Sequence, residues 1–141
     1  MSKQIYPCFW FDGNARSAAD FYCSIFKNSR ILESNAMVVI FEVNGFKVMG
    51  LNGGPSFTFN EAVSLVVSCD SQEEIDYYWE KLTADGGKES RCGWLKDKFG
   101  FSWQIVPSNM GELMSDPEKS RRVMQAMMGM KKIDIDALRS A

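Results

Sequence analysis

The sequence predicts an α+β fold made of two copies of one supersecondary unit, followed by a C-terminal helical extension. Two echoes at nearly the same offset indicate the duplication. Asp20-Phe21-Tyr22 returns 56 positions later as Asp76-Tyr77-Tyr78, and Gly45-Phe46 returns 55 positions later as Gly100-Phe101. The chain of 141 residues is expected to form a single domain. Its parts are module one over about residues 1–55, module two over about 61–107 and a helical tail over 108–141.

The first module opens with a strand and an amphipathic helix. Residues 5–11 are short, aromatic and apolar, as in a buried strand, and Pro7 places this strand at an edge or near its start. Residues 15–26 carry apolar side chains at helical spacing after a capping turn. Residues 37–43 and 46–51 then predict a hairpin, because Asn44-Gly45 is a favourable two-residue turn.

The second module follows the same order. Residues 62–69 form a β-branched run, and the polar residues 70–73 can cap a helix that continues to about residue 84. Residues 89–95 and 101–106 predict the closing strands, with residues 96–100 as the turn between them. Each module is therefore expected to be β-α-β-β, with room for one more short strand.

The tail has a different character. Asp116-Pro117 predicts a helix start, since an acidic cap is followed by a first-turn proline. Residues 118–128 place methionines along one side of that helix, and six of the nine methionines lie between Met110 and Met130. Such a helix is typical of a pliable core cover or a dimer contact, and a ligand lid is the alternative.

The composition indicates which classes of partner and site the protein is not expected to have. A net charge of −2 gives no basic field for nucleic acid, and no apolar run reaches the roughly 20 residues of a membrane span. The polar start of the chain predicts no signal peptide. The four cysteines form no CxxC pair, and there is no histidine to complete a zinc site. Reduced, buried thiols in a cytoplasmic protein are therefore expected.

Several motifs resemble one family over almost the whole chain. They are residues 7–11 (PCFWF), 21–22 (FY), 51–55 (LNGGP), 92–97 (CGWLKD), 102–107 (SWQIVP) and 132–135 (KIDI). The chain resembles the glyoxalase/vicinal-oxygen-chelate superfamily and, within it, the PhnB-like branch, also labelled 3-demethylubiquinone 3-methyltransferase-like. The resemblance implies two paired βαβββ modules of the glyoxalase/bleomycin-resistance type, each curved around a cleft, and a homodimer.

The resemblance also locates where a metal would be held. Metal-dependent members take one ligand from the first and one from the last strand of each module, which here implies Pro7, Met49, Val63 and Gln104. A slip of one residue would bring in Cys8 or Ser64. Since only Gln104 offers a suitable oxygen, we expect no metal. No GxGxxG motif opens a helix to hold S-adenosylmethionine, so no cofactor is expected either.

Strand alternation and the implied ligand positions direct Phe9, Phe11, Met49 and Gln104 toward the cleft. Such a cleft would hold a flat or apolar small molecule, unless the aromatic rings fill it themselves. Trp94 is expected to wall the pocket. Lys96 and Asp97 either polarise a ligand or form a solvated turn, and Asn52 either contacts the ligand or stays in its turn. The candidate ligand-binding residues are thus Phe9, Phe11, Met49, Asn52, Trp94, Lys96, Asp97 and Gln104.

Three classes of function fit these observations. The leading hypothesis is a metal-free protein that binds an unidentified small molecule. The second is a metal-independent enzyme that uses Gln104, Lys96, Asp97 or Cys92, although Cys92 has no histidine to activate it. The third is a structural or regulatory dimer whose cleft is closed by its own side chains.

Overall fold

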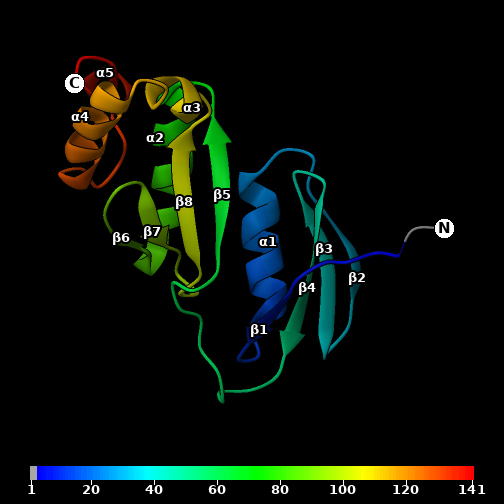
Figure 1. Ribbon diagram of the computed structural model, residues 1–141. Coiled ribbons are helices and arrows are strands. Elements are labelled where there is room, and N and C mark those ends of the chain that lie inside the picture. The colour runs from blue at the N-terminus through cyan, green and yellow to red at the C-terminus, as the bar shows by residue number, and fades with distance from the viewer. Residues whose placement is uncertain (1–2) are drawn as a thin grey trace. The chain divides into compact units, whose positions relative to one another are not determined.

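The structure, a computed structural model, describes residues 3–141 and divides the chain into two compact units. The first unit ends at Phe59 and the second begins at Asn60. Each unit contains one four-stranded mixed sheet with a helix on one face, which Figure 1 shows for both. The α+β prediction with two βαβββ modules and a helical extension is confirmed. That the two modules behave as a single domain stays a prediction.

In the first unit, the helix α1 packs on a sheet whose strand order is β1-β4-β3-β2. The strand β1 pairs parallel with β4, and the other pairs are antiparallel. The apolar stripe of α1 is buried as its spacing predicted, and the Tyr22 ring stacks on Phe41 with centroids 6.1 Å apart. The bounds are β1 (Cys8–Phe11), α1 (Ala15–Ile25), β2 (Arg30–Ser34), β3 (Val38–Val43) and β4 (Phe46–Asn52).

The second unit repeats this topology. Its sheet order is β5-β8-β7-β6, so in both sheets the first strand lies beside the fourth, followed by the third and the second. The helix α2 begins after Ser71, whose side chain accepts a hydrogen bond from the Glu74 amide at 3.2 Å. The bounds are β5 (Ser64–Cys69), α2 (Gln72–Thr83), the short helix η1 (Ala84–Gly86), β6 (Lys88–Glu89), β7 (Trp94–Lys96) and β8 (Ser102–Pro107).

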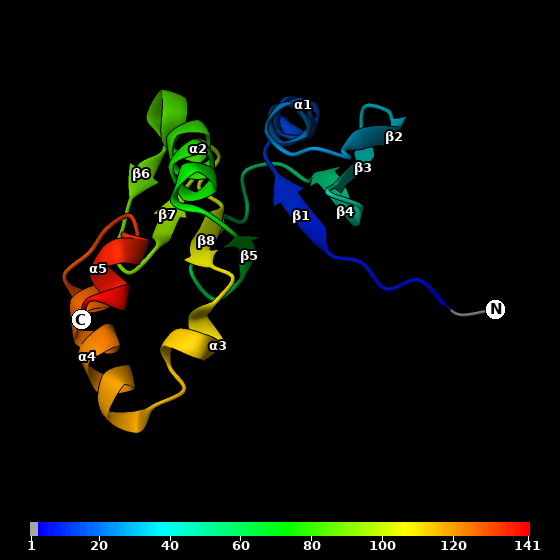
Figure 2. The same cartoon turned by 90° about the horizontal axis from the view of Figure 1, so that it is seen from above.

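The tail belongs to the second unit. It contains α3 (Met110–Leu113), α4 (Pro117–Met128) and α5 (Ile135–Arg139), of which α4 and α5 pack side by side in Figure 2. Asp116 caps α4 by accepting from the Glu118 amide at 3.1 Å, as the sequence predicted. Ile133 and Leu138 are fully buried, so the tail completes the core of this unit.

Two elements differ from the prediction. The additional short strand for which module one left room is β2, to whose residues no strand had been assigned. Residues 89–95 were expected to form one strand, but they form the end of β6, a turn and the start of β7. The chain reverses there because Cys92 and Gly93 both adopt positive φ, at 58° and 86°. Among the described residues, 3–141, no helix is long and apolar enough to cross a bilayer.

The register of the second sheet divides its side chains between two faces. Leu95, Trp103 and Ile105 are buried on the α2 side. Because side chains alternate along a strand, the neighbouring residues point to the other face. We call that other face the Gln104 face; it carries Ser64, Val66, Trp94, Lys96, Ser102 and Gln104.

Candidate functional site

The pairing of β7 with β8 brings three of the predicted site residues together. Trp94 lies directly opposite Gln104, and Lys96 lies opposite Ser102. Opposed residues of paired strands direct their side chains to the same face of the sheet. Trp94, Lys96 and Gln104 therefore share the Gln104 face, with Ser102 among them.

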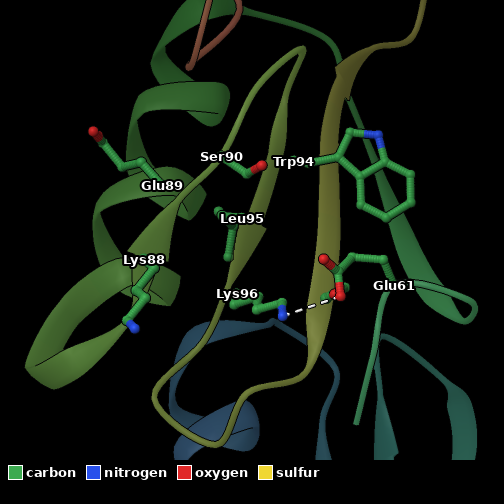
Figure 3. A pocket seen from close by; sticks show the side chains of 8 residues that line it. Glu61, Lys88, Glu89, Ser90, Trp94, Leu95 and Lys96 are labelled. Atoms are coloured by element: carbon green, nitrogen blue, oxygen red, sulfur yellow. Dashed lines mark ion pairs between the residues drawn. The ribbon is translucent and has the colours of Figure 1, made fainter.

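A cavity of about 190 Å³ opens beside these residues. In Figure 3, Trp94 lies at one side of it and the Lys96–Glu61 pair at another, while Lys88 and Glu89 point away from that pair. An engineered cavity of roughly 150 Å³ in another protein holds benzene, so this volume suits a molecule with about one ring. The lining residues are Glu61, Lys88, Glu89, Ser90, Trp94, Leu95, Lys96 and Ser102.

An ion pair lies at the rim of the cavity. Lys96 Nζ lies 3.0 Å from Glu61 Oε1, and the two side chains are 37% and 64% exposed. The hydrogen bond from Lys96, and then its positive charge, lower the pKa of the Glu61 carboxyl. Exposed ion pairs of this kind contribute little to stability, so the pair can open readily.

Two hydroxyl groups complete the polar part of the face. Gln104 Nε2 donates to Ser64 Oγ at 2.9 Å, which fixes the orientation of the amide. Ser102 is fully buried, and its Oγ has no hydrogen-bond partner among the described residues. A buried polar group without a partner costs about 1–3 kcal/mol. Ser102 is therefore a group that a bound molecule could satisfy.

Asp97 does not line the cavity that Lys96 lines, and a role for Asp97 in ligand binding stays a prediction. Asp97 is 2% exposed. Its Oδ1 accepts from the amides of Phe99 and Phe101 at 2.9 and 3.1 Å, and its Oδ2 accepts from Trp103 Nε1 at 2.9 Å. These bonds hold the β7–β8 turn against the α2 side of the sheet.

Phe9 and Phe11 also differ from the expectation, because they do not share a face with Met49. In the ladder of β1 with β4, Phe9 lies opposite Gly50, and Met49 lies opposite Cys8. A Cβ at Gly50 would contact Ala15 of α1, so this is the helix side. The two phenylalanines are buried there, with Phe59 at their edges, 5.9 and 5.3 Å between ring centroids.

Asn52 serves the fold of the first unit through both ends of its amide. Its Oδ1 accepts from the Ala15 amide at 2.9 Å, where α1 begins, and its Nδ2 donates to the Ala36 carbonyl at 3.0 Å. Asn52 is the last residue of β4 rather than a turn residue, and a ligand contact for it stays a prediction.

Sequence reasoning did not select Glu61 or Ser102 as site residues. Alternation along the last strand does place Ser102 on the same face as Gln104, so that signal was present. Nothing in the sequence marks Glu61, because it lies outside any strand and meets Lys96 only through folding.

The residues at the implied ligand positions do not fit a catalytic divalent metal. The register places Cys8 beside Met49 and Val66 beside Gln104. A thiol, a thioether, an alkyl group and one amide are poor donors for a hard cation. Within residues 3–141, no group of three or more histidine, cysteine, aspartate or glutamate side chains is placed to hold a metal. A metal-free protein stays a prediction.

The glycine pairs do not form a cradle for S-adenosylmethionine. A Cβ at Gly53 would lie 2.3 Å from the Trp10 ring, and a Cβ at Gly87 would lie 2.6 Å from the Thr83 backbone. Gly54 and Gly86 have positive φ, as turn residues do. Each pair is a turn packed against its own unit, so neither offers backbone amides to a cofactor.

A family model and a solved structure both match this chain. A family model described as 3-demethylubiquinone-9 3-methyltransferase matches residues 3–106. The PhnB protein from Bacillus cereus is 30% identical, with a TM-score of 0.67 over 74% of this chain and 99% of that chain. No curated protein matches the chain.

Two further solved structures are similar in fold. The fosfomycin resistance protein FosX from Listeria monocytogenes is 16% identical, with a TM-score of 0.61 over 82% of this chain and 97% of that chain. A glyoxalase-related enzyme from Fulvimarina pelagi is 18% identical, with a TM-score of 0.56 over 75% of this chain and 88% of that chain. The chain therefore has the fold of the glyoxalase superfamily.

Proposed function

Because the chain belongs to the 3-demethylubiquinone-9 3-methyltransferase family, in its PhnB-like branch, we propose that it binds a small planar molecule on the Gln104 face of its second unit. The observation that carries the proposal is the cavity beside Trp94, Lys96 and Ser102. An aromatic wall with a few convergent polar groups is the usual form of a small-molecule site.

Each side of the cavity has a separate role in this proposal. The Trp94 indole supplies a flat apolar surface on which a ring can stack. Lys96 supplies a positive charge, and Ser102 supplies a hydroxyl that has no partner within residues 3–141. Gln104, held by Ser64, offers its amide oxygen on the same face.

We propose that binding needs no metal and no methyl donor. The residues beside Met49 and Gln104 supply too few hard donors for a divalent cation, and the glycine pairs are turns. Metal analysis of protein purified without chelator is expected to give less than one equivalent of zinc, nickel, manganese or iron. A tightly held equivalent of any of them would contradict this part of the proposal.

The proposal is tested by a thermal-shift screen of small ring compounds, followed by titration of each hit. Hits should stabilise the protein saturably, and Trp94→Ala should abolish the stabilisation. Tyr77→Ala is the control, since Tyr77 is an aromatic side chain on α2 that does not line the cavity. A screen without hits, or hits that Trp94→Ala leaves unchanged, would refute a site on this face.

The same hits distinguish a binder from an enzyme. Each hit is incubated with the protein and analysed for products. Stabilisation without turnover supports a binding protein. Turnover that Gln104→Ala abolishes, with the fold intact by circular dichroism, would establish the metal-independent enzyme instead.

The proposal includes a homodimer in the cytoplasm. Met124 and Met128 on α4 are 48% and 66% exposed, which offers apolar area to a second copy. The four free cysteines fit a reducing compartment. Light scattering at micromolar concentration should give twice the 16.0 kDa of the chain, and a monomer mass would contradict the dimer.

A further inference from the structure

We propose that the molecule bound beside Trp94 is a planar monocarboxylate, and that Glu61 is an internal competitor for its place at Lys96. This inference rests on the proposed function and specifies the ligand class of the same site. It follows from the ion pair at the rim, the unsatisfied hydroxyl of Ser102 and the volume of the cavity.

The Lys96 ammonium is the positive charge directed to the rim, and a carboxylate already holds it. Glu61 Oε1 lies 3.0 Å from Lys96 Nζ, while the Lys88 side chain points away from the pair (Figure 3). One ammonium matches one negative charge. A dianion such as a phosphate would leave one negative charge unmatched unless Lys88, which also lines the cavity, turned toward it.

The Glu61 side chain can move away from Lys96. Glu61 lies in the segment before β5, outside any strand, and its side chain is 64% exposed. Releasing an exposed ion pair costs little, and a ligand carboxylate recovers that cost when it takes the same position on Lys96. The competition with Glu61 therefore weakens the binding of a carboxylate by a small factor.

The second oxygen of a carboxylate has a partner deeper in the site. Ser102 lies opposite Lys96 in the β7–β8 ladder, so its hydroxyl and the ammonium point to the same face. Ser102 Oγ is buried without a partner among the described residues, and it can donate to a carboxylate oxygen. A carboxylate bound by Lys96 and Ser102 would direct an attached ring toward Trp94, within about 190 Å³.

The experiment is an NMR titration of the ¹⁵N-labelled full chain with benzoate and with its neutral isostere benzamide. The signals followed are the Trp94 indole N–H and the Ser102 amide. Wild-type protein is expected to bind benzoate more tightly than benzamide. Glu61→Gln should tighten benzoate binding about two- to fivefold and leave benzamide unchanged, because only the anion competes with Glu61.

Two further variants complete the design. Lys96→Gln should weaken benzoate binding about tenfold and remove the preference over benzamide, since the charge-assisted bond is lost. Glu118→Gln is the matched control: Glu118 also forms an exposed ion pair in this unit, with Arg122 on α4, and its removal should change neither affinity. All these side chains are at least partly exposed, so each variant is expected to fold.

The outcomes distinguish a wrong ligand class from a wrong binding site. If both probes bind at Trp94 with equal affinity, or if Glu61→Gln acts no differently from Glu118→Gln, the inference is overturned and the proposed site stands. If neither probe shifts the Trp94 and Ser102 signals at millimolar concentration, the inference is overturned, and hits from the wider screen decide the proposed site.

Discussion

The carboxylate of Asp97 accepts a hydrogen bond from the indole of Trp103 across 2.9 Å, and both side chains are buried. Asp97→Ala leaves this indole and two backbone amides without their acceptor. We expect the free energy of unfolding to fall by about 3 kcal/mol or more, and Trp103→Phe to cost about 1–2 kcal/mol. Urea denaturation measures both.

Asp136→Ala is the control for this prediction, because the Asp136 side chain is 94% exposed. It should change the free energy of unfolding by no more than about 0.5 kcal/mol. Asp97→Ala with a similarly small effect would show that the carboxylate is not needed for the turn.

Gly53 is expected to tolerate no side chain. A Cβ there would lie 2.3 Å from the Trp10 ring, whose Nε1 donates to the Gly54 carbonyl at 2.9 Å. Gly53→Ala should destabilise the protein by about 1–3 kcal/mol through overpacking. Gly111→Ala is the matched control in α3, with no atom within 4 Å of the added Cβ, and should be neutral or stabilising by about 0.5–1 kcal/mol. Equal melting temperatures for the two variants would contradict the prediction.

Gln72 is expected to hold the tail against the second unit. Its Nε2 donates to the Ile133 carbonyl and its Oε1 accepts from the Ile135 amide, both at 2.9 Å. Gln72→Ala should cost about 1–3 kcal/mol and speed hydrogen exchange at the Ile135 amide about tenfold or more. Gln125→Ala, at an exposed position of α4, should leave that exchange rate unchanged. Protection of Ile135 that survives Gln72→Ala would show that the tail is held elsewhere.

Cys69 is expected to be the least reactive of the thiols. Burial, and then the negative charges of Glu74 and Asp70, raise the pKa of Cys69 to about 12. Its thiolate is therefore scarce at pH 8.5, and alkylation followed by mass spectrometry should find the exposed Cys8 modified before Cys69. Cys69 modified as fast as Cys8 would contradict this ordering.

The raised pKa of Cys69 also determines the direction in which stability changes with pH. The folded-state pKa of Cys69 lies above its ordinary value of 9.0. The stability that comes from the neutral thiol is therefore fully present below about pH 9 and is lost as the pH rises toward 12. Cys69→Ala should make unfolding less sensitive to pH in that window, as melting curves between pH 8 and 11 can measure.

The elements that were predicted correctly are those that depend on local periodicity in the sequence. The buried stripe of α1 and the capped start of α4 follow from residues a few positions apart, and both helices were placed within one residue of the structure. The β6–β7 turn was not predicted, because a cysteine with positive φ has no clear signature. A further short strand was expected in each module, but the residues of β2 were not identified, since most of them are exposed.

The faces of the first sheet depend on long-range register. Met49 pairs with Cys8 rather than Pro7, and a shift of one residue moves Phe9 and Phe11 to the helix side. In the second sheet the alternation was read correctly from Gln104, so Trp94, Lys96 and Gln104 do meet on one face. The Glu61–Lys96 pair joins residues 35 positions apart, and no local pattern indicates it.

Because the tail completes the core of the second unit, the two units can finish folding only at different points during synthesis. The first sheet and its helix are complete once residue 52 has left the ribosome. The second half cannot bury Ile133 and Leu138, or pair the Gly93 amide with the Lys131 carbonyl, until the tail has been translated. At about 5–20 residues per second, the delay between translating residue 52 and translating residue 138 lasts roughly 4–17 s. During it, the nascent second half is the part that exposes apolar surface to chaperones and to neighbouring chains.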